Sequence, residues 1–171
     1  MLSQPQDAYD LLTSLGAPPR LIRHLQLVGE AADALVAFYR ANGIEMKADL
    51  IRLGAAVHDA GKIAFPEELD GPGSRHEAAG QNLMLANGLS PEVAICCVSH
   101  AAWHGDNVTF EELSVALADK LWKGKREDEL ELRVIDASAA KLGVERWDIF
   151  ASFDEEFERI AVGGVERLSR S

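Results

Sequence analysis

The 171-residue sequence has few cysteines and no long apolar run. Its only cysteines, Cys96 and Cys97, are adjacent, a spacing that matches neither a CxxC redox pair nor a zinc site, so we expect two buried, reduced thiols. The apolar runs are shorter than the ~18 to 20 residues of a membrane-spanning helix. The N-terminus has no basic segment followed by an apolar one, so no signal peptide is expected. These absences predict a cytoplasmic protein without a membrane partner.

Positive charge is also scarce. The chain has 17 Lys and Arg residues against 28 Asp and Glu residues, which gives a formal net charge of -11. A protein that coats nucleic acid needs a positive field over its surface, so we expect no bulk nucleic-acid binding. A small phosphorylated partner remains compatible with this charge, because a local basic cluster or bound cations can hold it. No feature of the sequence defines an oligomeric state.

Strand-like alternation is missing, and helical patterns take its place. Apolar residues recur every three or four positions in the segment after Pro19, where His24 lies at the edge of the stripe. Ser74 and Thr109, each followed three residues later by Glu, predict capping boxes, and Ser90-Pro91 predicts another helix start. We therefore predict an all-α bundle forming one domain over 1–171, with helices over about 5–15, 18–42, 47–59, 74–87, 90–100, 109–123, 127–142 and 145–169. The longest connection, about 63–73, is either functional or a plain surface loop.

The histidines are the chemically informative residues. Four of the five, His24, His58, His76 and His100, lie in predicted helices or at their ends beside apolar residues. Asp59 and Asp119 share this setting, where a carboxylate is costly unless it is paired or bound to a cation. A single inward histidine is usually a hydrogen-bonded core residue, but six such residues meeting one His-Asp pair indicate a metal site. Imidazole and carboxylate donors without thiolates suit Fe, Mn, Co, Ni or Zn rather than Ca.

The order of these residues resembles the HD superfamily of metal-dependent phosphohydrolases. The resemblance is carried by "RHLQLVGEAA", "LGAAVHDAGK", "SRHEAAGQNLM", "CCVSHAAWH" and "ALADKLW", all between about residues 20 and 125, with further helices over about 127–169. It implies a compact HD-domain bundle. One divalent ion would be surrounded by His24, His58, Asp59 and Asp119. In the branch of the family with a second ion, Asp59 bridges the two while His76 and His100 hold the second, so we expect two ions.

The resemblance also implies a reaction, the hydrolysis of a nucleotide-like phosphoester or phosphoanhydride by a metal-activated water. Lys62 occupies the position of the family's phosphate-contacting lysine. We expect His76, His100 or His104 to protonate the leaving oxygen. For His104 the alternative, that it has no role at the site, is equally compatible with the sequence. Lys123 and Arg126, in "DKLWKGKRED", either guide the substrate or complement a helix C-terminus. Trp103 and Trp122 stack a base or belong to the core.

Departures from well-known branches narrow the choice. The sequence lacks the acidic pair of guanosine-tetraphosphate hydrolases, the second nearby histidine of deoxynucleotide triphosphohydrolases and the Gly-Tyr-Pro signature of cyclic-di-GMP phosphodiesterases. It is most similar to the small stand-alone phosphohydrolases, which include dinucleoside-tetraphosphate hydrolases. Two alternatives stay open, a di-iron oxygenase on the same scaffold and a non-catalytic signalling module. The C-terminal helices cover the site, form a dimer face or complete the core, and we favour the last.

Overall fold

Helices make up the regular structure of the protein, as the sequence predicts. The computed structural model describes residues 2–171, and no strand occurs among them. None of the helices within those residues is long and apolar enough to cross a membrane. The elements are α1 (Pro5–Ser14), α2 (Pro19–Ala41), α3 (Ala48–Val57), the 3-10 helices η1 (Ala60–Ile63) and η2 (Pro66–Leu69), α4 (Arg75–Ala86), α5 (Pro91–Ala94), α6 (Cys96–Ser99), α7 (Phe110–Leu121), α8 (Asp128–Leu142), α9 (Arg146–Val162) and α10 (Gly164–Ser169).

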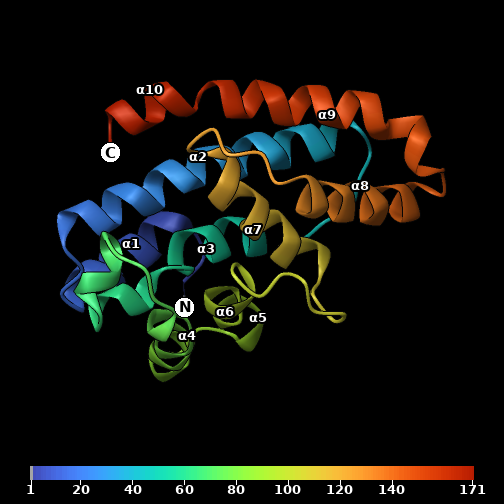
Figure 1. Ribbon diagram of the computed structural model, residues 1–171. Coiled ribbons are helices and arrows are strands. Elements are labelled where there is room, and N and C mark those ends of the chain that lie inside the picture. The colour runs from blue at the N-terminus through green and yellow to red at the C-terminus, as the bar shows by residue number, and fades with distance from the viewer. Residues whose placement is uncertain (1) are drawn as a thin grey trace.

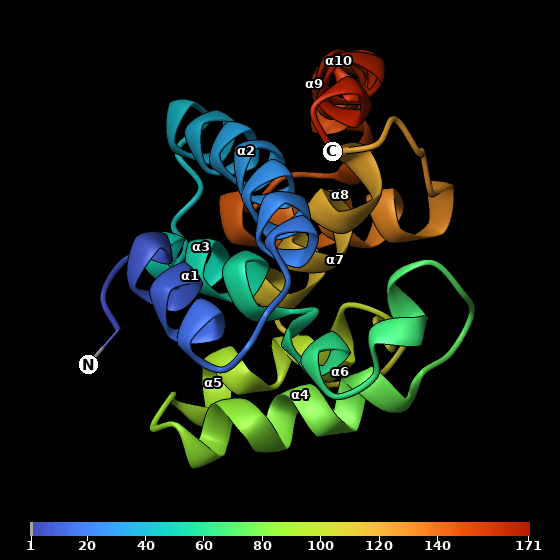
Figure 2. The same ribbon diagram turned by 90° about the vertical axis from the view of Figure 1, so that its left-hand side faces the viewer.

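The long helix α2 runs between α9 and α3 (Figure 1). It packs against α3 and α7, which also pack against each other, and α9 runs along its opposite side. Helices α4, α5 and α6 form a separate group below α3, which Figure 2 shows from the side. One apolar cluster fills the space among α2, α7, α8 and α9, and another lies among α1, α3, α4 and α5. Packing in these two clusters therefore fixes α2, α3 and α7 relative to α4 and α6.

Local sequence signals account for several helix ends. Thr109 and Glu112 form the predicted capping box at the start of α7, and the Ser90 side chain accepts a hydrogen bond from the Val93 amide at the start of α5. Gly143 ends α8 with φ +67°, in the left-handed region that favours glycine. The predicted helix ends are thus confirmed where side chain and backbone act locally.

Three predicted details differ. Ser74 makes no capping hydrogen bond, because the Glu68 carboxylate from the preceding loop accepts from the first amides of α4 instead. The predicted helix after Ser90 is interrupted at Ile95 and becomes α5 and α6. The predicted helix over 145–169 breaks between α9 and α10, where Gly164 lies so close to the Gly124 backbone that an added Cβ would be 2.3 Å from its amide nitrogen.

The cysteines and two of the tryptophans are buried. Cys96 and Cys97 have no exposed surface, and burial raises the pKa of Cys97 to about 12, which keeps the thiol protonated at neutral pH. Trp103 and Trp122 are 5% and 6% exposed, so each packs mainly as a core residue.

Candidate metal centre

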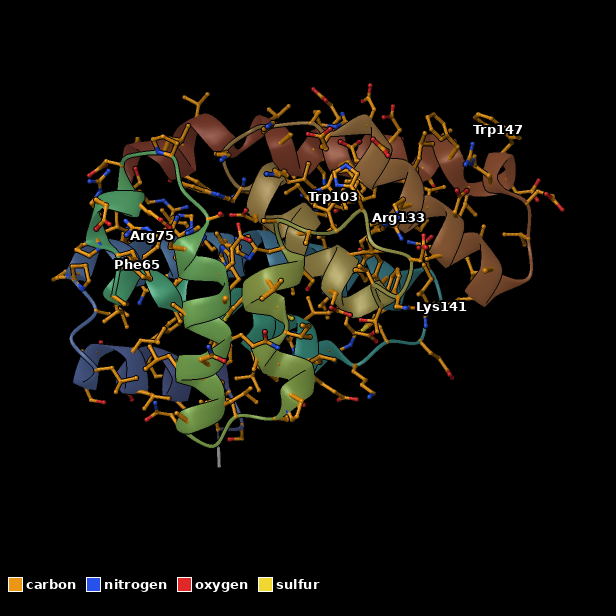
Figure 3. All side chains as sticks on the ribbon, turned by 60° about the horizontal axis from the view of Figure 1, so that its bottom comes forward. Phe65, Arg75, Trp103, Arg133, Lys141 and Trp147 are labelled. Atoms are coloured by element: carbon orange, nitrogen blue, oxygen red, sulfur yellow. The ribbon has the colours of Figure 1, made fainter. Side chains whose placement is uncertain are left out.

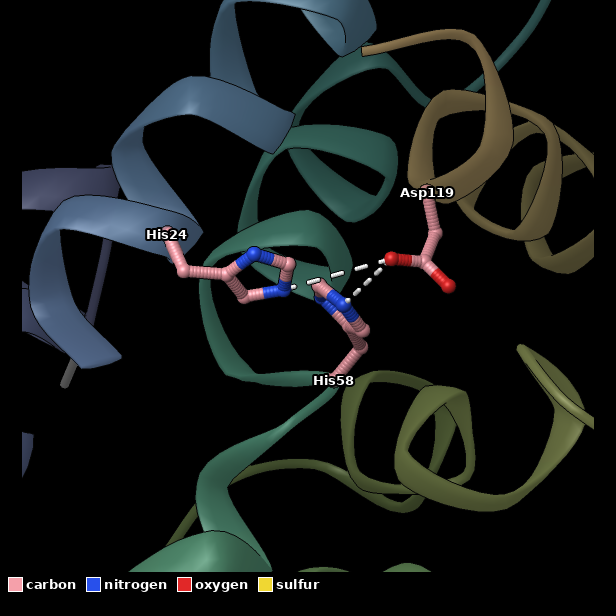
Figure 4. A group of neighbouring side chains, drawn as sticks. All are labelled: His24, His58 and Asp119. Atoms are coloured by element: carbon pink, nitrogen blue, oxygen red, sulfur yellow. Dashed lines mark hydrogen bonds and ion pairs between the residues drawn. The ribbon is translucent and has the colours of Figure 1, made fainter. Parts of the chain in front are cut away.

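Four histidines and two aspartates meet where α2, α3, α4, α6 and α7 converge. Each comes from a different place in the fold: His24 lies in α2, His58 directly follows α3, Asp59 precedes η1, His76 is in the first turn of α4, His100 directly follows α6, and Asp119 is in the last turn of α7. Their donor atoms form two groups, one of His24, His58 and Asp119 and one of Asp59, His76 and His100. Figure 4 shows how the two imidazoles of the first group face the Asp119 carboxylate.

Asp59 lies between the two groups. Its Oδ2 atom is 3.0 Å from His24 Nε2 and 3.6 Å from His58 Nε2. Its Oδ1 atom is 3.3 Å from His76 Nε2 and 3.5 Å from His100 Nε2. The two oxygens of one carboxylate thus face two different histidine pairs, which is the arrangement of a carboxylate that bridges two cations.

The histidine tautomers favour metal binding. Nδ1 of His58 is 2.8 Å from the Ala55 carbonyl oxygen, and Nδ1 of His100 is 3.0 Å from that of Cys96. A carbonyl oxygen only accepts, so each Nδ1 carries a hydrogen, and Nε2 is the ring atom that faces the carboxylates and can coordinate a metal ion. Lone pairs facing carboxylate oxygens repel unless a proton or a metal ion lies between them. His24 Nε2 is buried and has no hydrogen-bond partner, although a carboxylate oxygen lies beside it.

The donor separations fit a transition metal. Two ligand atoms that are each about 2.0 to 2.2 Å from an ion lie about 2.8 to 3.6 Å apart at octahedral or tetrahedral angles. His58 Nε2 and Asp119 Oδ1 are 3.2 Å apart, and the four separations around Asp59 fall in the same interval. Buried histidine and aspartate groups of this kind suit a divalent metal ion, and the donor set does not distinguish among Fe, Mn, Co, Ni and Zn.

The electrostatics of the cluster are set by burial and by mutual pairing. Burial disfavours ionised Asp59, but His58 and the other histidines outweigh it and hold the pKa of Asp59 well below its usual range. Burial also disfavours protonated His58, yet Asp59 and Asp119 raise the pKa of His58 to about 9. For His100 burial dominates and lowers the pKa to about 4. Despite burial, His58 also holds the pKa of Asp119 below its usual range, so both carboxylates are ionised at neutral pH, and a metal ion would displace the proton on His58.

Glu68 belongs to the site although the sequence analysis did not select it. The residue is 4% exposed, and its Oε2 atom accepts a hydrogen bond of 2.6 Å from His76 Nδ1. Burial opposes its ionisation, but the hydrogen bonds from His76 and Arg75 lower the pKa of Glu68 to about 2. No spacing rule connects it to the histidines. The one signal was its place in the long acidic connection next to His58-Asp59.

A cavity of about 290 Å³ opens beside the cluster. Its lining includes His24, Lys62 and Lys123, together with Arg20 and Trp122. Lys62 Nζ is 2.8 Å from Asp59 Oδ2, so the ammonium lies between the cavity and the carboxylate. Within residues 2–171, Lys123 makes no ion pair. The cavity thus joins a basic wall to the group of metal-binding side chains.

Two of the predicted site residues lie away from this cavity. His104 stacks on Trp103 with 3.6 Å between ring centroids, and its side chain is 61% exposed. Arg133 donates hydrogen bonds to the carbonyls of Trp103 and Gly105, which fixes this loop against α8, and Figure 3 shows Trp103 and Arg133 in neighbouring positions. The Arg126 guanidinium is enclosed by carboxylates of α8 and α9 and is not part of the cavity lining.

His76 and His100 also have little freedom for proton transfer. Nδ1 of His76 is bonded to Glu68 and Nδ1 of His100 to a carbonyl, while both Nε2 atoms face Asp59.

Comparison of the chain with protein-family models, with curated proteins and with solved structures returned no match. The helical frame and the histidine-aspartate cluster are compatible with an HD domain, and the case for a metal centre rests on the geometry.

Proposed function

We propose that the protein is a metal-dependent phosphohydrolase of the HD type, acting on a nucleotide-like phosphoester or phosphoanhydride. The observation that carries the proposal is the position of Asp59, whose two oxygens face two different histidine pairs. A donor set of this kind beside a cavity with lysines in its wall suits a substrate that is itself anionic. Nothing in the cavity lining selects a particular base.

His24, His58 and Asp119, with one oxygen of Asp59, would hold the first ion, and His76 and His100, with the other oxygen, the second. Two such ions would supply Lewis-acid stabilisation of phosphoryl oxygens and lower the pKa of a coordinated water. The protein's own contribution is to keep both carboxylates ionised and to present the four Nε2 atoms from helices and helix ends.

Lys62 is the cationic side chain best placed to act on the substrate. Its side chain is 16% exposed, it lines the cavity, and its ammonium lies against Asp59. An incoming phosphoryl group would compete with Asp59 for this ammonium, and Lys62 would then stabilise charge on the leaving oxygen or donate a proton to it. Lys123, also in the cavity wall, would hold a more distant phosphate.

The test combines metal content with hydrolysis. We would measure bound metal in the purified protein and phosphate release from phosphomonoesters, phosphodiesters and dinucleotides with added Mn, Co, Ni or Fe. The expected result is close to two ions per chain. Asp59→Ala should reduce phosphate release at least 10²-fold, because it removes a ligand common to both ions. Asp106→Ala, which removes an exposed aspartate outside the cluster, is the matched control and should leave both measurements unchanged.

The same assay, with oxygen consumption measured in addition, separates the alternative functions. Two irons with oxygen consumption and no hydrolysis of any substrate would replace the proposal with a di-iron oxygenase. A chain that binds no metal and hydrolyses nothing would overturn the assignment of the six ligands and leave a non-catalytic module. Full activity in Asp59→Ala would contradict the central role of that carboxylate.

A further inference from the structure

Glu68 is a charged side chain enclosed by the protein, on a loop segment rather than a long helix. A buried carboxylate is costly unless its oxygens are hydrogen-bonded. Both oxygens of Glu68 are satisfied: Oε2 accepts from His76 Nδ1 at 2.6 Å and from the His76 amide at 3.0 Å, and Oε1 accepts from the Arg75 amide at 3.2 Å. All of these donors belong to the first two residues of α4.

The connection over 63–73 is built to keep this carboxylate in place. Gly73 has φ +152°, and a Cβ at this position would be 2.4 Å from Glu68 Oε1, so any other residue would be strained here and would push against the Glu68 carboxylate. Asp70 pairs with Arg20 at the start of α2, which ties the outer side of the loop to the bundle. The Arg75 guanidinium lies 4.4 Å above the centre of the Phe65 ring, a contact visible in Figure 3.

Capping of α4 explains only part of these contacts. A carboxylate at a helix N-terminus needs only the backbone amides and the favourable helix dipole. The bond to His76 Nδ1 goes beyond capping and is the shortest of the set. Because Nδ1 donates to Glu68, the ring presents its Nε2 lone pair, and this atom lies 3.3 Å from Asp59 Oδ1.

We propose that Glu68 is a positioning residue for the second metal ion, acting through His76. The inference rests on the proposed dinuclear site and deepens it. His58 and His100 are oriented by backbone carbonyls of their own helical segments, whereas His76 is oriented by a carboxylate supplied from a loop. A carboxylate partner fixes the ring and makes its other nitrogen a better ligand. The second ion thus depends on the 63–73 loop, and the first does not.

The experiment is a metal titration of four proteins: wild type, Glu68→Ala, His76→Ala and the double variant. Manganese binding would be followed by calorimetry and by the electron paramagnetic resonance of coupled ion pairs. We expect Glu68→Ala to weaken the binding of the second ion about 10- to 100-fold and to leave the affinity for the first ion unchanged. In the His76→Ala background, Glu68→Ala should add no further loss, because Glu68 acts through that ring. Glu67→Gln, at an exposed neighbouring position, is the matched control and should bind two ions as wild type does.

A second readout needs no metal. The proton NMR spectrum of the metal-free protein should contain a low-field imidazole N–H resonance that disappears in both Glu68→Ala and His76→Ala and persists in Glu67→Gln. Equal weakening of both ions, or an additive loss in the double variant, would reduce Glu68 to a general structural role and overturn the inference. If Glu68→Ala bound both ions with the affinities of the wild type, the inference would be overturned as well. A wild-type chain that binds no ion overturns the proposed function and this inference with it, and that result is visible before any variant is made.

Discussion

At the scale of single residues, His58 links metal binding to pH. Burial opposes its protonation, but Asp59 and Asp119 raise the pKa of His58 to about 9, so the metal-free protein holds this proton at pH 7. A metal ion must displace it. The apparent affinity for the first ion should therefore rise about tenfold per pH unit from pH 7 and level off near pH 9.

Calorimetry in buffers with different ionisation enthalpies measures this displacement. About one proton should be released with the first ion at pH 7, about half of one at pH 9 and almost none well above pH 9. His104→Ala removes an exposed histidine and should not change the release, whereas His58→Ala should abolish it. A first-ion affinity that stays constant between pH 7 and 9 would contradict the role of this proton.

Sequence patterns were enough to predict the positions of some site residues and not of others. His58-Asp59 and Asp119 are near helix ends whose apolar faces define the inward direction, so their meeting could be predicted. Glu68 could not, because its burial depends on a loop closed by Gly73 and on amides of α4 that no local pattern reveals. His104 was ambiguous because the helical spacing from His100 ends at the turn, and stacking on Trp103 then determines its direction.

At the scale of elements, the contact between η1 and α4 brings Asp59 near His76. A Cβ on Gly61 would be 1.8 Å from the His76 carbonyl oxygen and 2.6 Å from the Gly80 amide nitrogen. Gly61→Ala should therefore force the two elements apart. We expect a loss of about 1 to 3 kcal/mol or more in the free energy of unfolding. Weaker binding of the second ion should accompany it, because Asp59 and His76 would separate.

Urea unfolding of the metal-free protein measures the stability change, and manganese titration measures the site. Gly105→Ala is the control, since its added Cβ would meet its nearest neighbour at 3.4 Å, an ordinary contact. That variant should change stability by no more than about 0.5 kcal/mol. An unchanged urea midpoint for Gly61→Ala would show that η1 and α4 can be spaced further apart without cost.

Element boundaries were predictable where their cause is local. The capping box at Thr109 needs only residues within one turn, and it is present. The start of α4 and the break between α9 and α10 depend on partners distant in the chain, Glu68 for the first and the Gly124 backbone for the second. Sequence patterns within one segment contain no information on such partners.

At the scale of the whole molecule, Arg126 connects three parts of the bundle. Arg126 lies in the connection that follows α7. Its guanidinium contacts Glu131 in α8 at 2.6 Å and, in α9, Asp154 at 2.6 Å and Glu158 at 2.5 Å. These carboxylates raise the pKa of Arg126, led by the hydrogen bonds to Glu131. The contacts favour a role in holding α7, α8 and α9 together over the predicted role in substrate binding.

The two roles give opposite results in one pair of variants. Arg126→Met leaves the Glu131 carboxylate, which is 5% exposed, without its cation. It should lower the free energy of unfolding by about 1 to 3 kcal/mol, a value kept modest by the partial exposure of the guanidinium. KM for the hydrolysed substrate should not change. Lys123→Met, in the cavity wall, should raise KM several-fold and leave stability within about 0.5 kcal/mol. If Arg126→Met instead raised KM at unchanged stability, Arg126 would be a substrate ligand, and the ion pairs with α8 and α9 would be replaced when the substrate binds.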